Sequence, residues 1–399
     1  MRPTNNRMEL HYVVLVCAIA VLVLRGWLRA RSRFWSQQPV FHTHKLHYWL
    51  MKPHVIERGP PRVRPHVNHL RVSTSVVGET NPDVLELVCR FIRAHYMRTQ
   101  GAVYSPPSEH LLEVLRRSEG PSYLTRHFTP RKLHAGDGTI VADSVMTGVM
   151  TARRMEAVIG GSTIPVMYVD NLCVHPRQRG KGVASELIQT HHYDTRIASP
   201  SVMVHLFKRE GELTQIVPVV KYWTYMYVMP SEPERRLPGG TSVVRVEKTS
   251  LADAWEILEN TASACAFSAL PSIAAFAASV ESGLLDPHVL VGPGGPLALY
   301  VFRDPSLSHG GERALECVAS VRRSSLEAFI LGFGKAVASA NGRIAASSLL
   351  IEALGDNVSL CREYESGRST RVLGRSPTAY FLYNYSHPTV QAEDALAIA

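Results

Sequence analysis

The sequence predicts an α+β protein of two consecutive halves, preceded by an apolar N-terminal helix. Helical and strand-like patterns recur in a similar order on both sides of a charged, proline-rich stretch near the middle of the chain. Of the 399 residues, 45% are hydrophobic, which is enough to bury a sizeable core, and the length suffices for two domains of ordinary size. We therefore divide the chain into residues 1–30, 31–229 and 241–399, with a linker at 230–240.

An uninterrupted apolar run covers residues 12–24, and it extends to residues 10–28 if Arg25 turns its charge toward the lipid headgroups. Four arginines follow the run within nine positions and two precede it, which places the C-terminal body in the cytosol. A cleaved signal peptide is the alternative, although these arginines make a poor small-residue cleavage region. The sequence thus predicts a single-pass membrane protein that contacts the membrane through residues 10–28 and whose body faces the cytosol.

Charge and cysteine content exclude several classes of protein. The 43 Lys and Arg residues outnumber the 34 Asp and Glu residues, so the formal net charge is +9 and we expect an affinity for anions. The basic residues are scattered, with no aromatic-interleaved basic module, so we do not expect nucleic-acid binding. The 6 cysteines form no Cys-x-x-Cys pair, and His42, His44 and His47 have no acidic or cysteine ligand near them, so we expect no metal.

Two helices open the first half. Asn81 and Pro82 are a typical N-cap and first helical residue, and apolar residues then recur at helical spacing from Val84 to Ile92. A Tyr-Ser-Pro-Pro-Ser segment at residues 104–108 interrupts the pattern before a second helix through residues 111–115.

Strand patterns make up much of the remainder. A Gly-Asp-Gly turn at residues 136–138 precedes a meander of strands at residues 139–145, 147–152 and 163–175, and further strands are expected at 202–207 and 216–228. In the second half, we expect strands at residues 242–246, 288–291, 297–302, 315–321 and 380–385, and helices at residues 250–262 and 326–340.

A strand, a basic glycine loop and a helix stand in direct succession in the first half. The buried strand pattern at residues 166–175 leads into Pro-Arg-Gln-Arg-Gly-Lys-Gly at 176–182, and a helix follows from residue 183. Glycines let a backbone approach a ligand closely, and a helix N-terminus flanked by cations attracts anions, so this loop is typical of a pyrophosphate cradle. A tight solvated turn would carry the same residues. The second half has no such loop, which fits either a duplicated architecture with one working cofactor site or two unrelated domains.

The spacing Arg177-x-x-Gly180-x-Gly182 after a strand resembles the acyl-CoA pyrophosphate loop of the GNAT superfamily of N-acyltransferases. Other segments are similar, in the same order, to one branch of that superfamily, the glycylpeptide N-myristoyltransferases (N-tetradecanoyltransferases). These segments are Phe34-Trp35-x-x-Gln38-Pro39-Val40, Tyr104-Ser105-Pro106, Asn171-Leu172-Cys173-Val174-His175, Tyr222-Trp223 and residues 380–385. The resemblance implies an α+β fold of two tandem GNAT-like acyl-CoA N-acyltransferase units, here placed behind the N-terminal membrane-anchor helix.

The resemblance also implies an enzyme that uses acyl-CoA as co-substrate and needs no nucleophilic side chain. The N–H groups of Asn171 and Leu172 would bind the thioester oxygen, and the terminal carboxylate of Ala399 would take the amine proton. The implied cofactor-binding residues are Phe34, Trp35, Cys173, Val174, Arg177, Gln178, Arg179, Gly180, Lys181, Gly182, Val183 and Ala184. The implied substrate-binding residues are Tyr104, Lys208, Tyr222 and Tyr383.

Two departures from the family pattern keep alternatives open. Gly180 and Gly182 stand where N-myristoyltransferases usually carry bulkier basic residues, and residues 207–213 replace a segment of small, hydroxyl-bearing residues at the acceptor site. We expect a monomeric enzyme that moves a myristoyl or similar fatty acyl group from acyl-CoA to a protein or peptide N-terminal amine. The alternatives are a GNAT-type N-acetyltransferase that uses acetyl-CoA, and a membrane-tethered binding protein of the same fold that has lost turnover.

Overall fold

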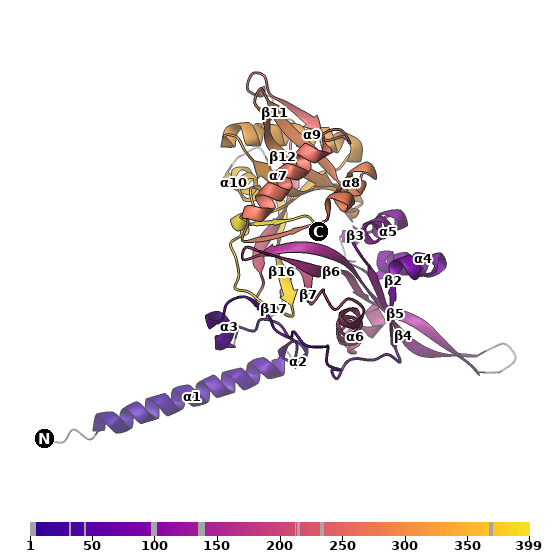
Figure 1. Ribbon diagram of the computed structural model, residues 1–399, viewed down its shortest axis with the longest axis vertical. Helices are drawn as coiled ribbons and strands as arrows, with labels where there is room; N and C mark the ends of the chain where they lie inside the picture. Colours follow the sequence, from indigo (N-terminus) through magenta and orange to yellow (C-terminus); the bar gives the residue numbers. More distant parts are fainter. Residues whose placement is uncertain are drawn as a thin grey trace.

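The computed structural model describes residues 5–31, 33–43, 45–96, 102–134, 140–211, 213, 216–231, 235–366 and 370–399 (Figure 1). It is an α+β protein, as predicted, in which one large sheet continues through both halves of the chain and helices pack against it. The Gly-Asp-Gly turn predicted at 136–138 and the central histidine of the His42–His47 stretch, His44, lie outside the described residues.

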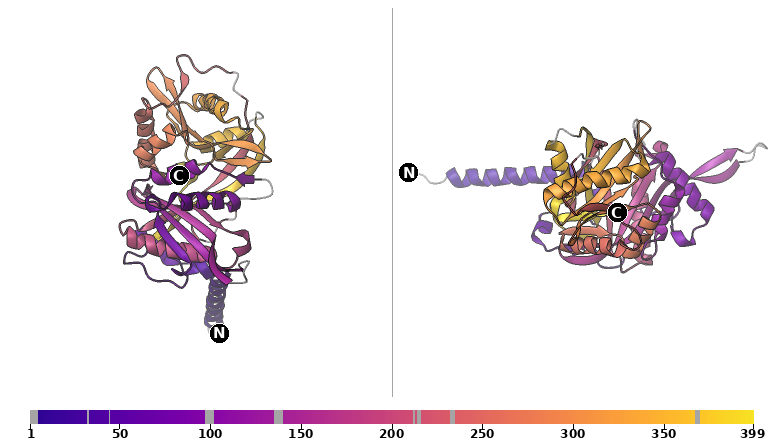
Figure 2. Two further views of the ribbon diagram at one scale, coloured as in Figure 1. Left: turned by 90° about the vertical axis from the view of Figure 1, so that its right-hand side faces the viewer. Right: turned by 90° about the horizontal axis from the view of Figure 1, so that it is seen from above.

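Helix α1 (Asn5–Arg31) projects away from the body of the molecule (Figures 1 and 2). Its large apolar side chains between Tyr12 and Val23 are more than half exposed. Within the described part of the chain, no helix combines the length and the apolar character needed to cross a lipid bilayer. The membrane span predicted over residues 10–28 is therefore not supported.

Local side chains fix the start of the first long helix of the body. Helix α4 (Pro82–His95) begins where the sequence predicts, because Asn81 accepts a hydrogen bond from the N–H of Asp83 and proline occupies the first helical position. Helix α5 (Ser108–Arg116) packs beside it over a shared apolar core. The shorter elements around them are α2 (Arg33–Ser36), α3 (Leu46–Leu50), β1 (His54–Val55), β2 (Val72–Val76) and β3 (Ala102–Tyr104).

The predicted strand meander is present, with longer strands than the sequence indicates. The strands are β4 (Tyr123–His134), β5 (Ile140–Ile159), β6 (Ser162–Val174), β7 (Val204–Glu210) and β8 (Val220–Val228). Strand β5 is continuous across the two segments predicted at 139–145 and 147–152, and it pairs antiparallel with both β4 and β6. Helix α6 (Val183–Ala198) then connects β6 to β7, which run parallel.

The second half repeats this order of elements. Its strands are β9 (Ser242–Arg245), β10 (Phe267–Leu270), β11 (Asp286–Gly292), β12 (Gly295–Arg303), β13 (Leu307–His309), β14 (Glu312–Arg322), β15 (Ser348–Glu352), β16 (Val372–Tyr383), β17 (Tyr385–Ser386) and β18 (Ala395–Ala397). Its helices are α7 (Leu251–Ala264), α8 (Ile273–Glu281), α9 (Leu326–Ile344) and α10 (Asn357–Ser366). The sequence predicts β9, α7, β11, β12, β14, α9 and the end of β16 with the start of β17, but not β10, α8, β13, β15, α10 and β18.

The two halves exchange strands. The order β4-β5-β6-β7 of the first half is continued by β16 from the second half, and the order β11-β12-β14-β15 of the second half is continued by β8 from the first. In each half, the exchanged strand adjoins a parallel pair with a helical crossover, β6-α6-β7 or β14-α9-β15. The matching strand order favours the duplicated architecture over two unrelated domains.

The C-terminal residues of the chain are also held in place at the junction between the halves. A buried apolar cluster spans the junction between the halves and includes Ala395 and Ala397 of strand β18, which pairs with β10. Chain termini are usually poorly ordered unless a sheet or core holds them. Here the C-terminus lies between the two halves, as Figures 1 and 2 show, at the border of the cavity described next.

Candidate active site

Strands β6 and β7 separate partway along their length and leave a cavity between them. Their parallel pairing extends only from Val166 with Val204 to Val169 with Phe207. Beyond this point β6 stays paired with β5, whereas β7 stays paired with β16. A cavity of about 300 Å³ lies at the opening and is lined by residues of both strands, of helix α6 and by Trp35; we call it the smaller cavity.

A bulge in β6 turns the backbone at the mouth of this opening. Asn171 has a φ of 52°, in the left-handed region that side chains other than glycine rarely occupy, and the register with β5 shifts opposite it. Its side-chain amide donates to the Thr151 hydroxyl at 3.0 Å, which holds the bulge in place. Its N–H donates to the carboxylate of Asp170 at 2.7 Å, and Leu172 lines the smaller cavity.

Hydrogen bonds hold the start of the glycine loop, whereas the two glycines at its end face open space. His175 accepts a hydrogen bond from the N–H of Arg177, and the guanidinium of Arg179 donates to the carbonyl oxygens of Val174 and His95. Gly180 and Gly182 have φ values of 75° and 87°, and a Cβ at either would meet only open space.

Helix α6 begins directly after the loop without a side-chain cap. Its N-cap is Gly182, which has no side chain to accept a hydrogen bond from the first N–H groups of the helix. These groups also have no carbonyl partner within the helix. In contrast, Ser325 caps the equivalent helix α9 by accepting from the N–H of Ala328. The loop and helix start of the first half are therefore suited to bind an anion such as a pyrophosphate.

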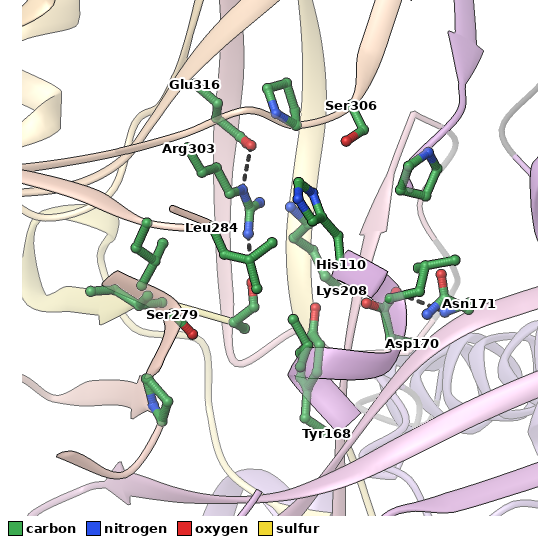
Figure 3. A pocket seen from close by; sticks show the side chains of 18 of the residues that line it. His110, Tyr168, Asp170, Asn171, Lys208, Ser279, Leu284, Arg303, Ser306 and Glu316 are labelled. Atoms are coloured by element: carbon green, nitrogen blue, oxygen red, sulfur yellow. Dashed lines mark hydrogen bonds and ion pairs between the residues drawn. The ribbon is translucent and has the colours of Figure 1, made fainter. Parts of the chain in front are cut away.

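A larger cavity of about 510 Å³ lies between the two halves of the chain (Figure 3). Asp170, Asn171 and Lys208 line both cavities, so the two spaces meet at the bulge of β6. The C-terminal residue Ala399 also borders the larger cavity. A ligand that extends through the opening between β6 and β7 would therefore meet, at the bulge, a second ligand placed in the larger cavity.

A set of ion pairs between largely buried side chains forms one wall of the larger cavity. The Arg303 guanidinium donates to Glu316 at 2.6 Å and to the terminal oxygen of Ala399 at 2.8 Å. Close by, the Lys208 ammonium contacts Glu352 at 2.7 Å and Glu210 at 3.1 Å. Figure 3 shows Arg303 and Glu316 facing one another above Lys208 and Tyr168.

In this wall, oppositely charged neighbours keep Glu316 and Lys208 ionised. Burial alone would raise the pKa of Glu316, but Arg303 and Lys208 more than offset this effect and hold it below its ordinary value. Likewise, burial alone would lower the pKa of Lys208, but Glu352 and Glu210 raise it well above its ordinary value. Both groups are therefore ionised at neutral pH, and each depends on its partners to remain so.

Three histidines are buried beside the smaller cavity. His191 and His192 of helix α6 and His205 of β7 lie within contact distance, and Thr195 donates its hydroxyl hydrogen to the His191 carbonyl at 2.7 Å. The Thr195 oxygen then accepts from Nε2 of His205 at 3.1 Å, so Nδ1 of His205 is left to accept from Nδ1 of His192 at 3.4 Å. Burial lowers the pKa of all three histidines, for His205 to about 3, and all three are neutral.

The structure brings together many of the residues that the sequence assigns to the site. Trp35, Leu172 and Tyr383 line the smaller cavity, Tyr104 and Ala399 line the larger one, and Asn171 and Lys208 line both. The loop residues Arg177, Gln178, Arg179, Gly180, Lys181 and Gly182 lead into Val183 and Ala184 in the first turn of α6.

Other assigned residues lie away from the two cavities. Cys173 is buried in the core under helix α4, and Val174 packs in the small cluster under α6. Phe34 packs edge-to-face against Trp35, and Trp35 in turn stacks on Phe207. The hydroxyl of Tyr222 donates to Glu352 at 2.9 Å, which places this side chain inside the charged wall rather than on the cavity surface.

Of the charged groups in the wall of the larger cavity, the sequence analysis assigns Lys208 to the site but not Glu316, Glu352 and Arg303. Glu316 and Glu352 each stand alone in an apolar strand pattern, and this is the signal that could have marked them as paired. Arg303 ends such a pattern in β12. Asp170 lies directly before the bulge, inside the segment that the sequence predicts as a buried strand. Its carboxylate is the most polar group of that segment, and the sequence analysis gives it no role.

Comparisons with known proteins show the fold. No protein-family model matches the chain, and no curated protein matches its sequence. The structure is similar to crystal structures of Saccharomyces cerevisiae N-myristoyltransferase with bound myristoyl-CoA, one of them also with inhibitors. The identity is 13% in both, the TM-scores are 0.67 and 0.68, and the match covers 90% and 93% of this chain and 94% and 95% of the yeast chain. The predicted resemblance is therefore confirmed for the fold, which this chain shares over nearly its whole length.

Proposed function

We propose that this protein is an acyl-CoA-dependent N-acyltransferase that transfers a fatty acyl group to an amine. The observation that carries the proposal is the opening between the parallel strands β6 and β7, with a cavity inside it and an uncapped glycine loop and helix start beside it. The yeast protein of the same fold binds myristoyl-CoA, which supports an acyl-CoA in this opening. The glycine backbone and the first N–H groups of α6 would hold the phosphates of CoA.

The arrangement supports direct transfer, since the chain need supply only polarisation and a proton acceptor. The N–H of Leu172, and that of Asn171 once Asp170 has turned away, would stabilise the oxyanion that forms on the thioester carbonyl. An amine in the larger cavity would attack at the bulge, where the two cavities meet. The Ala399 carboxylate, held by Arg303, would take the amine proton as the new carbon–nitrogen bond forms. The carbon–sulfur bond would then break, and transfer of that proton to the departing thiolate would release CoA as the thiol.

The wall of the smaller cavity favours an acyl chain longer than acetyl. Its apolar part comes from Met150, Val169, Ile188 and Phe207, with Trp35 stacked on Phe207. Burial of apolar chain carbons against such side chains contributes about 0.8 kcal/mol for each methylene. Titration of the protein with CoA, acetyl-CoA and myristoyl-CoA should therefore give the tightest binding for myristoyl-CoA. Equal affinities for the two acyl-CoAs would indicate an acetyltransferase instead, and no binding of any would refute the proposal.

Replacement of Gly180 by valine should weaken CoA binding roughly tenfold without unfolding the protein. A β-branched residue resists a φ of 75°, so the loop backbone would move from the position that suits the phosphates, while the open space around it avoids a clash. Gly161→Val is a matched control, because Gly161 has a φ of 79° and equally open surroundings but lies in the turn between β5 and β6. Isothermal titration with CoA would compare the two variants. An equal loss in both would argue against the phosphate loop.

Extension of the chain by two glycines after Ala399 should reduce turnover at least tenfold and leave acyl-CoA affinity unchanged. The added residues would enter the larger cavity and carry the terminal carboxylate away from Arg303, whereas the smaller cavity would stay as it is. The same two glycines added at the N-terminus, on the far end of α1, are the control. Full turnover in the C-terminally extended protein would remove Ala399 from the mechanism.

A further inference from the structure

Three side chains on one face of the sheet are aimed into the larger cavity. Arg153 of β5 pairs with Tyr168 of β6, and Thr151 pairs with Asp170. Because side chains alternate along a strand, Arg153, Tyr168 and Asp170 project from the same face, and all three line the cavity. Arg153 and Asp170 are diagonal neighbours across the two strands, a relation that places two residues about 7–8 Å apart, within reach of long side chains.

Arg153 is a buried cation without an acidic partner. Only 9% of the residue is exposed, and its guanidinium lies 4.8 Å from the centre of the Tyr168 ring. Among the residues that the structure describes, no carboxylate lies within ion-pair distance of it and no acceptor makes a hydrogen bond with it. Burial lowers the pKa of Arg153 by more than the nearby Tyr168 and Asp170 raise it, so these neighbours compensate its charge only in part.

The other buried cations of this cavity differ from Arg153. Arg303 is paired with Glu316 and the chain terminus, and Lys208 with Glu352 and Glu210. These charges are neutralised by the protein itself. A guanidinium that is buried, borders a cavity and has no partner is instead suited to bind an anionic group of a ligand, because its planar fork matches a carboxylate.

Asp170 has the opposite charge and, in the part of the chain that the structure describes, likewise has no ion-pair partner. Its carboxylate accepts a hydrogen bond from the N–H of Asn171 at 2.7 Å. Within the described ranges, no lysine, arginine or histidine forms an ion pair with it. Figure 3 shows its side chain beside Asn171, on the wall of the cavity below Lys208 and His110. A cation could therefore bind Asp170 at the bulge, where the proposed transfer takes place.

From these two groups we infer that the acceptor is an amine that also carries a carboxylate: its ammonium binds Asp170 and its carboxylate binds Arg153. The inference rests on the proposed acyltransferase function and names the acceptor of that reaction. Each end of such a molecule would pair with one of these two charged groups, so both would gain a charge-assisted hydrogen bond. A free amino acid carries this chemistry, as does a peptide with an acidic residue near its N-terminus.

The test compares matched acceptors that differ only in the carboxylate. Glycine, β-alanine and 4-aminobutyrate are assayed against their amides, and the peptide Gly-Asp-Gly-amide against Gly-Asn-Gly-amide, with the acyl-CoA that binds tightest. The wild-type protein should prefer at least one acid over its amide by roughly ten- to hundredfold in kcat/KM, the range of a hydrogen bond to a charged group. Preference among the amino acids identifies a free amino acid, whereas preference confined to the aspartyl peptide identifies a peptide.

Substitution of Arg153 tests whether its side chain causes the preference for the acid over its amide. In Arg153→Met the ratio of kcat/KM for the acid to kcat/KM for its amide should fall to about one, and circular dichroism with thermal denaturation checks that the variant folds. Arg126→Met is the matched control, since Arg126 also lies over an aromatic ring, that of Phe128, and also has a pKa lowered by burial, but lines neither cavity. Arg126→Met should keep the full preference.

Binding without turnover gives a second measurement. In the complex of the protein with CoA, the amino acid that is preferred should bind more tightly than its amide, and Asp170→Asn should weaken its binding about tenfold while the affinity for CoA stays unchanged. Equal use of acids and amides by a wild-type protein that does transfer acyl groups would overturn this inference alone. A wild-type protein that binds no acyl-CoA would overturn the proposed function and this inference together.

Discussion

Acidification from pH 7 to pH 5 should lower the free energy of unfolding by about 2 kcal/mol for each histidine of the buried group His191, His192 and His205. Their pKa values lie below the ordinary value of 6.5 in the folded protein, for His205 at about 3, because burial disfavours the charged ring. Below pH 6.5 the unfolded chain therefore binds more protons than the folded one, and stability falls with pH until the folded pKa is reached. Urea denaturation at a series of pH values measures this slope.

Single variants can show that these histidines cause the dependence of the unfolding free energy on pH. His205→Phe keeps an aromatic ring of similar size and removes one titrating group, so the protein should take up about one proton fewer on unfolding between pH 6 and pH 5. His309→Gln removes an exposed histidine and should leave the slope unchanged. A slope that His205→Phe fails to reduce would mean that the group is already protonated in the folded protein.

Replacement of Arg303 by methionine should lower the free energy of unfolding by about 3–5 kcal/mol, the range for removal of one partner of a buried ion pair. Glu316 would lose its contact at 2.6 Å while its side chain stays only 6% exposed. Glu316 would then keep only the weaker attraction of Lys208, which forms its ion pairs with Glu352 and Glu210. Chemical denaturation at pH 7 measures the change.

An exposed ion pair is the control for this variant. Arg313 contacts Asp304 at 2.5 Å, but its side chain is half exposed, so Arg313→Met should change stability by less than about 1 kcal/mol. The double variant Arg303→Met with Glu316→Gln should recover part of the loss, because the remaining group is neutral and needs only a hydrogen bond. If Arg303→Met destabilises no more than Arg313→Met, the wall does not depend on this pair.

The parts of the fold and site that could be predicted are those with local signals. The N-cap at Asn81, the strand that leads into the bulge, the glycine loop and helix α6 all depend on residues that are close in sequence. Strand β4 was missed because Arg126, His127 and Arg131 interrupt an apolar alternation, although the sheet accommodates them by pairing with β2 and β5.

The parts that could not be predicted depend on partners far apart in the sequence. The pairing of Arg303 with the end of the chain joins residues 96 positions apart, and Lys208 and Glu352 are 144 positions apart. Nothing local marks β8 and β16 as strands that cross into the other half. Likewise, Arg153 reads as an ordinary strand residue until the register with β6 places it on the same face as Asp170.

The exchange of strands between the halves has a consequence for how the chain folds during synthesis. When the first half leaves the ribosome, its sheet ends at β7 with an unpaired edge, because β16 is made more than 160 residues later. Strand β8 likewise lacks its partner β15 until the second half has been synthesised. Ladders between such distant segments give a high contact order and slow folding, and unpaired edges invite association with other chains. The protein therefore reaches its native state as one cooperative unit, late in translation, rather than half by half.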